Sequence, residues 1–228
     1  NNITANNLIL SASTGIGSAD ALETQVSNVS AQVTDTSATG NIEITNTGSL
    51  TLDNLAGWGY AVKNFGAGNI TIEAIGDDAT SLFVSASIVS TAGDISLSAT
   101  NTVTAEIADI DYSYDNSSSY YALLSVGNTQ ITSSTGNITL SATNNVAITI
   151  DDCYGYYDES SNYAKIDVDS SGEISTGTGT IQLTADNNVT REVLSDGIPY
   201  YYEDYSYNYS EINNRGAIST TTNIDNFG

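Results

Sequence analysis

The stretch GDISLSATN at residues 93–101 returns as GNITLSATN at residues 136–144 and as GTIQLTADN at residues 179–187. Both steps are 43 residues long, and a fixed period is typical of a chain built from similar stacked units. Apolar and polar residues alternate within each copy, as in a β-strand with one face directed inward. The stretch therefore predicts an all-β solenoid in which equivalent strands of successive coils lie above one another.

Shorter relatives of this stretch occur through much of the chain. The unit Gly-[Asn/Asp/Thr]-Ile-x-[Ile/Leu] starts at Gly40, Gly68, Gly93, Gly136 and Gly179, with a near relative at Gly48. The step from Gly48 to Gly68 and the step from Gly68 to Gly93 are both much shorter than the 43-residue period. Such lengths suit one solenoid coil of about three short strands, with glycine at a corner where a side chain would block the turn.

Two regions of one continuous rod are predicted. Residues 1–92 are expected to form coils of about 20–25 residues, and residues 93–228 to form three coils with the 43-residue period. The larger units add a Tyr-rich segment, which we interpret as a lateral β-hairpin excursion, although two small coils per unit would fit the same length. Asp20 and Glu23 have the spacing of a capping box, so a short helical turn is expected near residues 20–27.

The 43-residue offset aligns three apolar columns and one polar column. The members of these columns are Ile95, Ile138 and Ile181; Leu97, Leu140 and Leu183; Val103, Val146 and Val189; and Asn101, Asn144 and Asn187. Stacked side-chain amides can hydrogen-bond along a β-rod. We therefore expect a structural ladder with an asparagine column inside it.

Fourteen of the 15 tyrosines fall in three clusters, at residues 112–121, 154–163 and 200–209. The same offset aligns Tyr114, Tyr157 and Tyr200 in one column and Tyr120 and Tyr163 in another. Stacked rings could form an aromatic ladder along one side of the rod. Two roles fit this ladder: a minor core that seals the excursions to the rod, or a contact face for glycans, surfaces or neighbouring filaments.

Acidic residues accompany the tyrosines. Asp109 aligns with Asp152, and Asp115 aligns with Asp158. Like charges in one column repel unless they face solvent or share a cation, and calcium takes carboxylate and carbonyl oxygen ligands. Solvated acids and a calcium site are both kept as predictions, although no EF-hand spacing is present.

The 27 acidic and four basic residues give a net charge of −23. Four cations cannot neutralise a phosphate track, so nucleic acid is excluded as a partner. The charge also disfavours anionic membrane surfaces, and no apolar stretch predicts membrane insertion. Cys153 is the only cysteine, so an internal disulfide is impossible; an incidental thiol is expected, with a cross-link between chains as the alternative.

An enzyme is not expected. The chain has no histidine and its cations are scattered, whereas a β-helical polysaccharide-degrading enzyme, the remote alternative, needs an acid or base and often a cation beside the developing charge. An ice- or surface-binding rod with a flat threonine array is a third class. Outward threonine in every coil would favour that class, but the TGTGT segment at residues 176–180 is not repeated.

The two ends of the chain continue one another in sequence. Residues 226–228 followed by residues 1–4 spell NFGNNIT, and the internal segment at residues 64–71 is NFGAGNIT. We expect the C-terminus to run into the N-terminus as one coil runs into the next, either in a longer tandem array or between subunits stacked head to tail. A translational contact of this kind does not close on itself and produces a filament.

The segments GNITLSATNNV at residues 136–146, TGIG at residues 14–17 and ALETQVSNV at residues 21–29 resemble the repeat region of filamentous-haemagglutinin-type exoproteins. These are large bacterial surface or secreted proteins of the two-partner secretion type. The resemblance covers most of the chain and weakens in the Tyr-rich segments. It implies a right-handed parallel β-helix, export from a bacterium and an adhesive or scaffold role.

The combined expectation is a structural and adhesive extracellular β-solenoid, a segment or subunit of a bacterial surface fibre that assembles head to tail. Its partners would be copies of itself, together with glycans or host or neighbouring-cell surfaces. The alternative is a glycan- or surface-binding β-helix module that does not polymerise.

Overall fold

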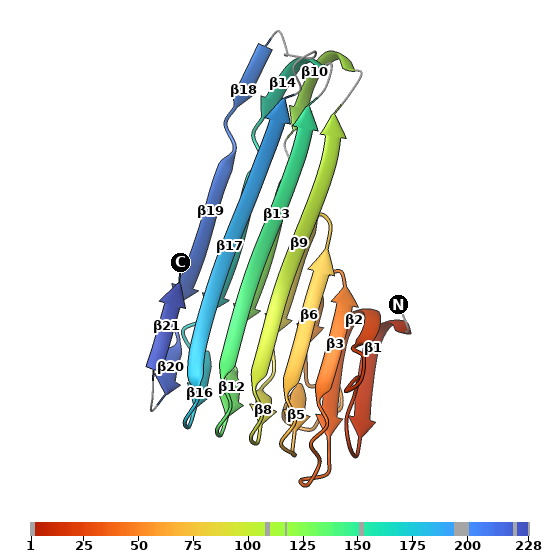
Figure 1. The fold of residues 1–228 in the computed structure, drawn as a ribbon, viewed down its shortest axis with the longest axis vertical. Helices are drawn as coiled ribbons and strands as arrows, with labels where there is room; N and C mark the ends of the chain where they lie inside the picture. Colours follow the sequence, from red (N-terminus) through yellow and green to blue (C-terminus); the bar gives the residue numbers. More distant parts are fainter. Residues whose placement is uncertain are drawn as a thin grey trace.

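The computed structural model describes residues 3–107, 110–116, 118–150, 153–193, 201–220 and 223–227. Within these ranges the chain is all-β: it forms 21 strands and no helix. Eighteen strands belong to one continuous sheet and three belong to a second sheet. Every strand pairing in the described ranges is parallel, so the prediction of a stacked parallel β-solenoid is confirmed at this level (Figure 1).

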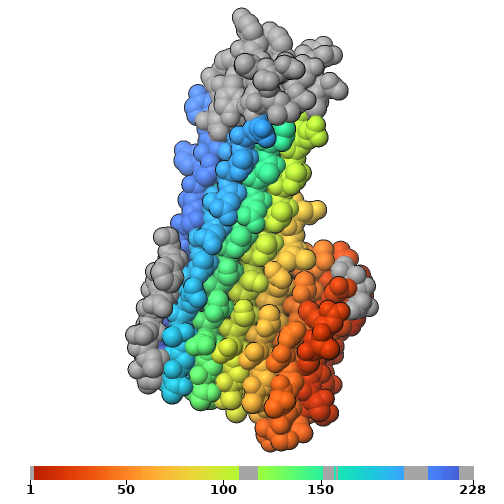
Figure 2. All heavy atoms as spheres, viewed as in Figure 1, coloured from red at the N-terminus to blue at the C-terminus, as the bar shows by residue number. Residues whose placement is uncertain are grey.

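The strands fall into three faces of a coil. The first face holds β3 (Ile42–Thr47), β6 (Ile70–Gly76), β9 (Ile95–Ile107), β13 (Ile138–Ile150), β17 (Thr180–Val193) and β21 (Asn223–Phe227). The second face holds β4 (Leu50–Leu52), β7 (Ala79–Val84), β11 (Ser119–Val126), β15 (Ser161–Val168) and β19 (Tyr207–Asn214). The third face holds β5 (Val62–Asn64), β8 (Ile88–Ser90), β12 (Gln130–Ser133), β16 (Glu173–Thr176) and β20 (Ala217–Thr220). Figure 2 shows the successive coils as adjacent bands of atoms.

The first coils are formed by β1 (Ile3–Ala12) and β2 (Leu22–Val33), which pair with each other. β2 then pairs in turn with β3, β4 and β5. The helical turn predicted near residues 20–27 is therefore wrong, because β2 begins at Leu22. A capping-box spacing favours a helix only locally, whereas Thr24 and Val26 are buried in the solenoid and bond to Asn46 of the next coil.

Coil length changes along the chain. Ile42 pairs with Ile70, Ile70 pairs with Ile95, and Ile95 pairs with Ile138, so the third step is much longer than the first two. That third step is the full repeat period, so each of the longer units is one coil and not two. The segment that starts at Gly48 enters the second face as β4, so it does not begin a coil.

The wide coils have a second core. The main core runs through all coils, and a separate cluster contains Val103, Ile107, Val146, Ile148 and Ile150. This cluster lies where β9 and its successors extend past the end of β6 (Figure 1). The extra length of the wide coils therefore builds a second apolar compartment beside the first.

A column of glycines lies at the corner before the first face. A Cβ on Gly68, Gly93, Gly136 or Gly179 would lie 2.0–2.2 Å from the carbonyl O of the glycine one coil earlier. Real Cβ atoms do not approach so closely, so only glycine fits between the stacked corners. This contact is the physical reason for the glycine that starts each repeat.

The Tyr-rich excursions differ from the predicted hairpins. In the described residues, β10 (Ile110–Asn116), β14 (Cys153–Asp158) and β18 (Tyr201–Asp204) pair in parallel with one another as the second sheet. Each excursion therefore adds a rung beside the equivalent excursion of the next coil, as the main strands do.

Candidate contact surface

The predicted apolar columns lie in adjacent rungs. The parallel register pairs Ile95, Leu97 and Val103 of β9 with Ile138, Leu140 and Val146 of β13, and these in turn with Ile181, Leu183 and Val189 of β17. The isoleucines and leucines of these columns are fully buried. They hold the solenoid together and are not a contact surface.

The asparagine column forms a hydrogen-bonded ladder between the two cores. Asn101 Nδ2 donates to Asn144 Oδ1 and Asn144 Nδ2 donates to Asn187 Oδ1, both at 2.8 Å. Asn144 Nδ2 also donates to the carbonyl O of Tyr120 at 3.1 Å, and Asn187 Nδ2 to the carbonyl O of Asn162 at 3.0 Å. The ladder therefore ties each wide coil to the next, and it ties β13 and β17 to the returning strand of the preceding coil.

A second polar column follows the corner glycines and was not predicted. The side-chain oxygen of Asn69 accepts a hydrogen bond from the backbone N–H of Asp94 at 2.9 Å. In the same way, the side-chain oxygen of Asp94 accepts from the backbone N–H of Asn137 at 2.7 Å. The side-chain oxygen of Asn137 accepts from the backbone N–H of Thr180 at 2.9 Å. The signal in the sequence is the Asn or Asp that follows the glycine. This side chain satisfies a backbone donor one coil further along.

Serine and threonine hydroxyls donate hydrogen bonds to the backbone carbonyls of the same glycine corner. Ser90 Oγ and Ser133 Oγ donate to the carbonyl O of Gly93 at 2.8 and 3.0 Å, and Thr176 Oγ1 donates to the carbonyl O of Gly136 at 2.7 Å. The signal here is a Ser or Thr three residues before the glycine, which the sequence analysis also missed. These buried hydroxyls satisfy corner carbonyls that no strand pairs.

A continuous tyrosine stack lies on the outer surface of the second face. The rings of Tyr121 and Tyr163 stack with centroids 4.9 Å apart and planes 3° apart, and those of Tyr163 and Tyr209 with centroids 5.2 Å apart and planes 12° apart. Tyr120 was predicted to align with Tyr163 but pairs with Asn162 and packs against the second core. The predicted column was thus displaced by one residue.

A β-bulge causes this displacement. Ile110 pairs with Cys153 in the expected register, but Ser113 pairs with Gly155, so the offset becomes one residue shorter within β10. Tyr114 consequently pairs with Tyr156 and not with Tyr157, whose backbone pairs with Glu203. A bulge shifts every later pairing until another loop restores the register. Tyr200 lies outside the described residues.

The predicted acidic columns are changed by the same shift. Asp115 pairs with Tyr157, and Asp158 pairs with Asn116 and Asp204, so the predicted alignment of Asp115 with Asp158 is wrong. Asp109 and Asp152 lie outside the described residues. Among the described side chains, no group of three or more potential metal ligands occurs. Calcium binding at the excursions stays a prediction.

Burial sets the ionisation of the central ring of the stack. The pKa of Tyr163 is raised from 10.0 by burial, and neighbouring Tyr121 and Tyr209 add to the rise. The unfolded chain therefore releases this proton at lower pH than the folded protein does. The stability that results is present below pH 10 and is lost as the pH rises through the folded-state pKa.

We expect Tyr163→Phe to reduce the loss of stability in strong alkali, because phenylalanine keeps the stacked ring and removes the proton. The measurement is the urea unfolding midpoint at about pH 8 and at about pH 11. Tyr207→Phe is the matched control, because Tyr207 is 73% exposed. Equal alkaline sensitivity of Tyr163→Phe and the parent protein would contradict this prediction.

An open hollow of ≈ 550 Å³ lies beside the tyrosine stack. It is lined by Tyr157, Glu159, Ser161, Tyr205 and Tyr207, and we call it the tyrosine hollow. The hydroxyl of Tyr157 donates to Glu159 Oε1, and the rings of Tyr157 and Tyr205 lie 5.7 Å apart at 56°. It combines exposed aromatic rings with one carboxylate.

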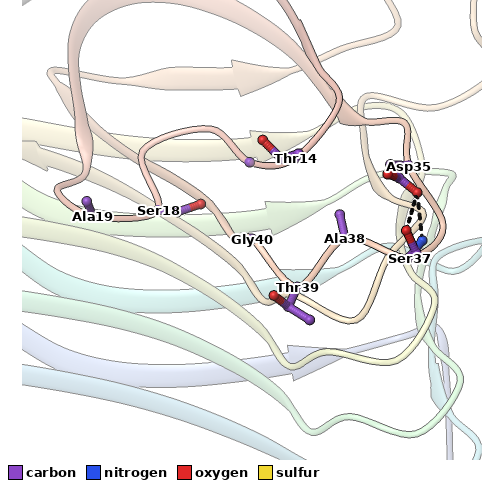
Figure 3. A pocket seen from close by; sticks show the side chains of 9 residues that line it. Thr14, Ser18, Ala19, Asp35, Ser37, Ala38, Thr39 and Gly40 are labelled. Atoms are coloured by element: carbon purple, nitrogen blue, oxygen red, sulfur yellow. Dashed lines mark hydrogen bonds between the residues drawn. The ribbon is translucent and has the colours of Figure 1, made fainter.

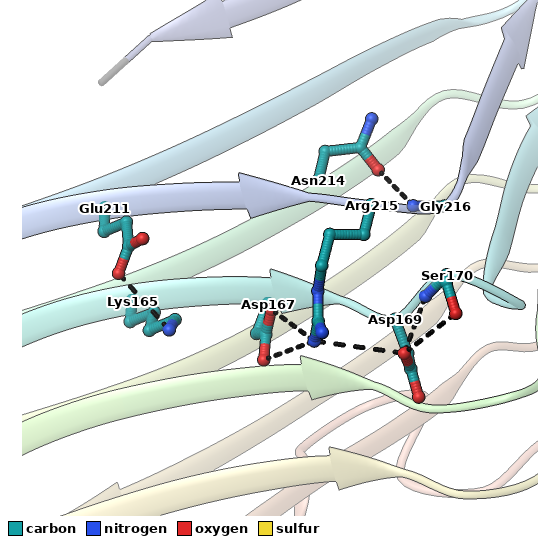
Figure 4. Close-up of polar contacts among 8 residues, drawn as sticks. All are labelled: Lys165, Asp167, Asp169, Ser170, Glu211, Asn214, Arg215 and Gly216. Atoms are coloured by element: carbon teal, nitrogen blue, oxygen red, sulfur yellow. Dashed lines mark hydrogen bonds and ion pairs between the residues drawn. The ribbon is translucent and has the colours of Figure 1, made fainter.

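Arg191 is the basic side chain beside this hollow, and its Nη2 donates to Ser160 Oγ at 3.3 Å. Two further basic side chains, on β15 and after β19, form ion pairs. Lys165 Nζ lies 3.2 Å from Glu211 Oε2 across β15 and β19, and Arg215 Nη2 lies 3.3 Å from Asp167 Oδ1 and 3.9 Å from Asp169 Oδ1 (Figure 4). Exposed pairs of this kind contribute about 0–1 kcal/mol each. They neutralise part of the acidic outer face of the last coils.

A larger hollow of ≈ 660 Å³ lies at the first corner, lined by small side chains and backbone (Figure 3). Asp35 is its one titratable residue among the described lining. Asp35 Oδ1 accepts from the backbone N–H and the hydroxyl of Ser37, both at 2.8 Å, and these bonds lower the pKa of Asp35. This carboxylate stabilises a turn.

The first face carries outward threonines, but they do not form a regular array. The first-face strands β3, β6, β9, β13 and β17 each have threonine at outward positions. The column that contains Thr100 and Thr143 also contains Ile75 and Asp186. An isoleucine and a carboxylate interrupt the pattern that an ice-binding rod would need.

No protein-family model, curated protein or solved structure matches this chain. Among the described residues there is no helix that is long and apolar enough to cross a membrane.

Proposed function

We propose that this chain is a structural and adhesive β-solenoid of the extracellular space, a segment or subunit of a bacterial surface fibre that continues end to end. The observation that carries the proposal is the stacking of identical side chains in parallel register through successive coils. Each coil contacts the next through backbone pairing, closely packed glycine corners and hydrogen bonds between side-chain amides. Such a stack gives a stiff rod with an outer surface free for contacts.

The ends of the described stack support end-to-end continuation. Among the described strands, β1 pairs only with β2, and β20 and β21 pair only with β16 and β17. The other backbone edge of each strand can pair with a further rung, whether that rung belongs to the same chain or to another copy. A heterologous contact of this type extends into a filament.

The course of the chain in Figure 1 supports a right-handed solenoid. The near strands β9, β13 and β17 run upward, the chain returns behind them, and each successive coil lies further to the left. This sense agrees with the resemblance to filamentous-haemagglutinin-type repeats, which also supports export and an adhesive role. A glycan- or surface-binding module that does not polymerise is the second candidate, favoured by the exposed rings of Tyr205, Tyr207 and Tyr209.

Electron microscopy and analytical ultracentrifugation of the purified chain test the fibre proposal. We expect filaments whose axial repeat equals one chain, with a sedimentation coefficient that rises with concentration. Leu10→Lys should abolish this assembly, because half-buried Leu10 packs on the core at the open end of the stack and a partner coil would cover it. Ile9→Lys is the matched control, because Ile9 is 51% exposed and should not change assembly. A parent protein that stays monomeric at every concentration would contradict assembly from separate subunits.

A further inference from the structure

The tyrosine hollow gathers aromatic surface that no other part of the described chain covers. Tyr205 is 57% exposed and Tyr207 is 73% exposed, and both lie at the rim of the same hollow. Large apolar side chains that stay exposed together mark a binding site more often than isolated ones do. The hollow of ≈ 550 Å³ has a volume in the range of small-molecule sites.

The rings form a corner and not a platform. Tyr157 and Tyr205 are inclined at 56° with centroids 5.7 Å apart, so the two rings do not form one flat surface. A flat sugar ring prefers a single extended aromatic face, whereas a compact rounded group can contact two inclined faces at once. The geometry therefore favours a compact head group.

Charge decides which compact group fits. The described lining contains the carboxylate of Glu159 and no basic side chain. The guanidinium of Arg191 lies on the inner side of this segment, where its Nη2 donates to the buried hydroxyl of Ser160 at 3.3 Å. The chain as a whole carries a net charge of −23. An anion is repelled at such a site, and a cation is attracted both by the carboxylate and by the negative faces of the rings.

The chain already places one ammonium group over aromatic rings. Lys63 Nζ lies 4.0 Å from the ring centroid of Phe65 and 5.3 Å from that of Tyr60. In the tyrosine hollow the described lining supplies rings and a carboxylate without an ammonium group.

We propose that the tyrosine hollow binds a compact organic ammonium group, presented by a small molecule or by a lysine side chain of a partner. Tyr157, Tyr205 and Tyr207 contact the cation through their ring faces, and Glu159 supplies the opposite charge. Tyr205 and Tyr207 lie in the last described coil, whose second edge is open to a further copy under the fibre proposal, so the site is also measured in the unassembled Leu10→Lys variant.

Isothermal titration with choline and with its neutral isostere 3,3-dimethylbutan-1-ol tests the charge requirement. We expect choline to bind about tenfold more tightly than the isostere. Titration with n-butylammonium separates the two sources, because it represents a lysine side chain whereas choline represents a quaternary small molecule. Equal affinity for choline and the isostere, or tighter binding of the neutral disaccharide cellobiose, would overturn the proposal.

Variants locate the site. Glu159→Gln keeps an acceptor for Tyr157 and removes the charge, so choline affinity should fall about fivefold or more while binding of the isostere is unchanged. Tyr205→Ala and Tyr207→Ala should each weaken choline binding, and Phe83→Ala, at a distant ring that is 39% exposed, should not. Unchanged choline binding in Glu159→Gln would overturn the assignment. The titrations are repeated in Leu10→Lys, so that loss of assembly and loss of binding are scored separately.

Discussion

Replacement of Gly136 by alanine is expected to destabilise the wide coils by at least about 3 kcal/mol. The new Cβ would lie 2.2 Å from the carbonyl O of Gly93, 2.4 Å from its carbonyl C and 2.7 Å from the backbone N of Asp94. All three atoms belong to the backbone, so no side-chain rotation can relieve the contact. The corner must move apart, which breaks the pairing of β9 with β13.

Gly48→Ala is the matched control. Gly48 has φ +89°, and a Cβ there would meet no atom within 4 Å. Its cost is therefore limited to backbone strain of about 1–2 kcal/mol. Urea unfolding followed by circular dichroism measures both variants. Equal stability of the two variants would mean that the spacing between coils adjusts freely at the corner, which would contradict close packing of the backbone there.

The sequence was sufficient to predict the register of β9, β13 and β17, because the repeat offset is unbroken from Leu97 through Leu140 to Leu183. It was not sufficient for the excursions. The paired residues Tyr121 and Tyr163 are separated in sequence by fewer residues than the repeat period, and the paired residues Tyr163 and Tyr209 are separated by more. The bulge in β10 and compensating loop lengths leave the total period unchanged, so a search at one period cannot detect the shift.

Two other predictions were wrong because they used local sequence patterns and did not include the pairing between coils. The capping-box spacing at Asp20 and Glu23 is a helix signal, but a single turn gains little by itself and the pairing of β2 with its neighbouring coils prevails. The segment at Gly48 has the pattern of a coil start because all three faces use alternating strands. Only the glycine at the corner before the first face distinguishes a coil start from the other two faces. The close contact that requires this glycine forms between two successive coils, so it cannot be seen in one segment alone.

The asparagine ladder gives the second large expected effect. Asn144→Ala should destabilise the protein by at least about 3 kcal/mol, because it removes three partners at once. Asn101 Nδ2 would lose its acceptor, Asn187 Oδ1 would lose its donor, and the carbonyl O of Tyr120 would lose the bond from Asn144 Nδ2. Asn101 and Asn144 are fully buried between the two cores, where an unpaired polar atom has little access to water.

Asn145→Ala is the matched control, because it removes an asparagine from the same strand without breaking the buried amide ladder. Asn145 is the next residue on the same strand and faces outward, where its Oδ1 accepts from Asn188 Nδ2 at 3.0 Å. Its loss should change stability by no more than about 0.5 kcal/mol. Hydrogen exchange of amides in β9, β13 and β17 should show faster opening in Asn144→Ala and not in Asn145→Ala. A similar effect in both variants would show that the amides act only as polar surface, and that apolar packing alone keeps the coils in register.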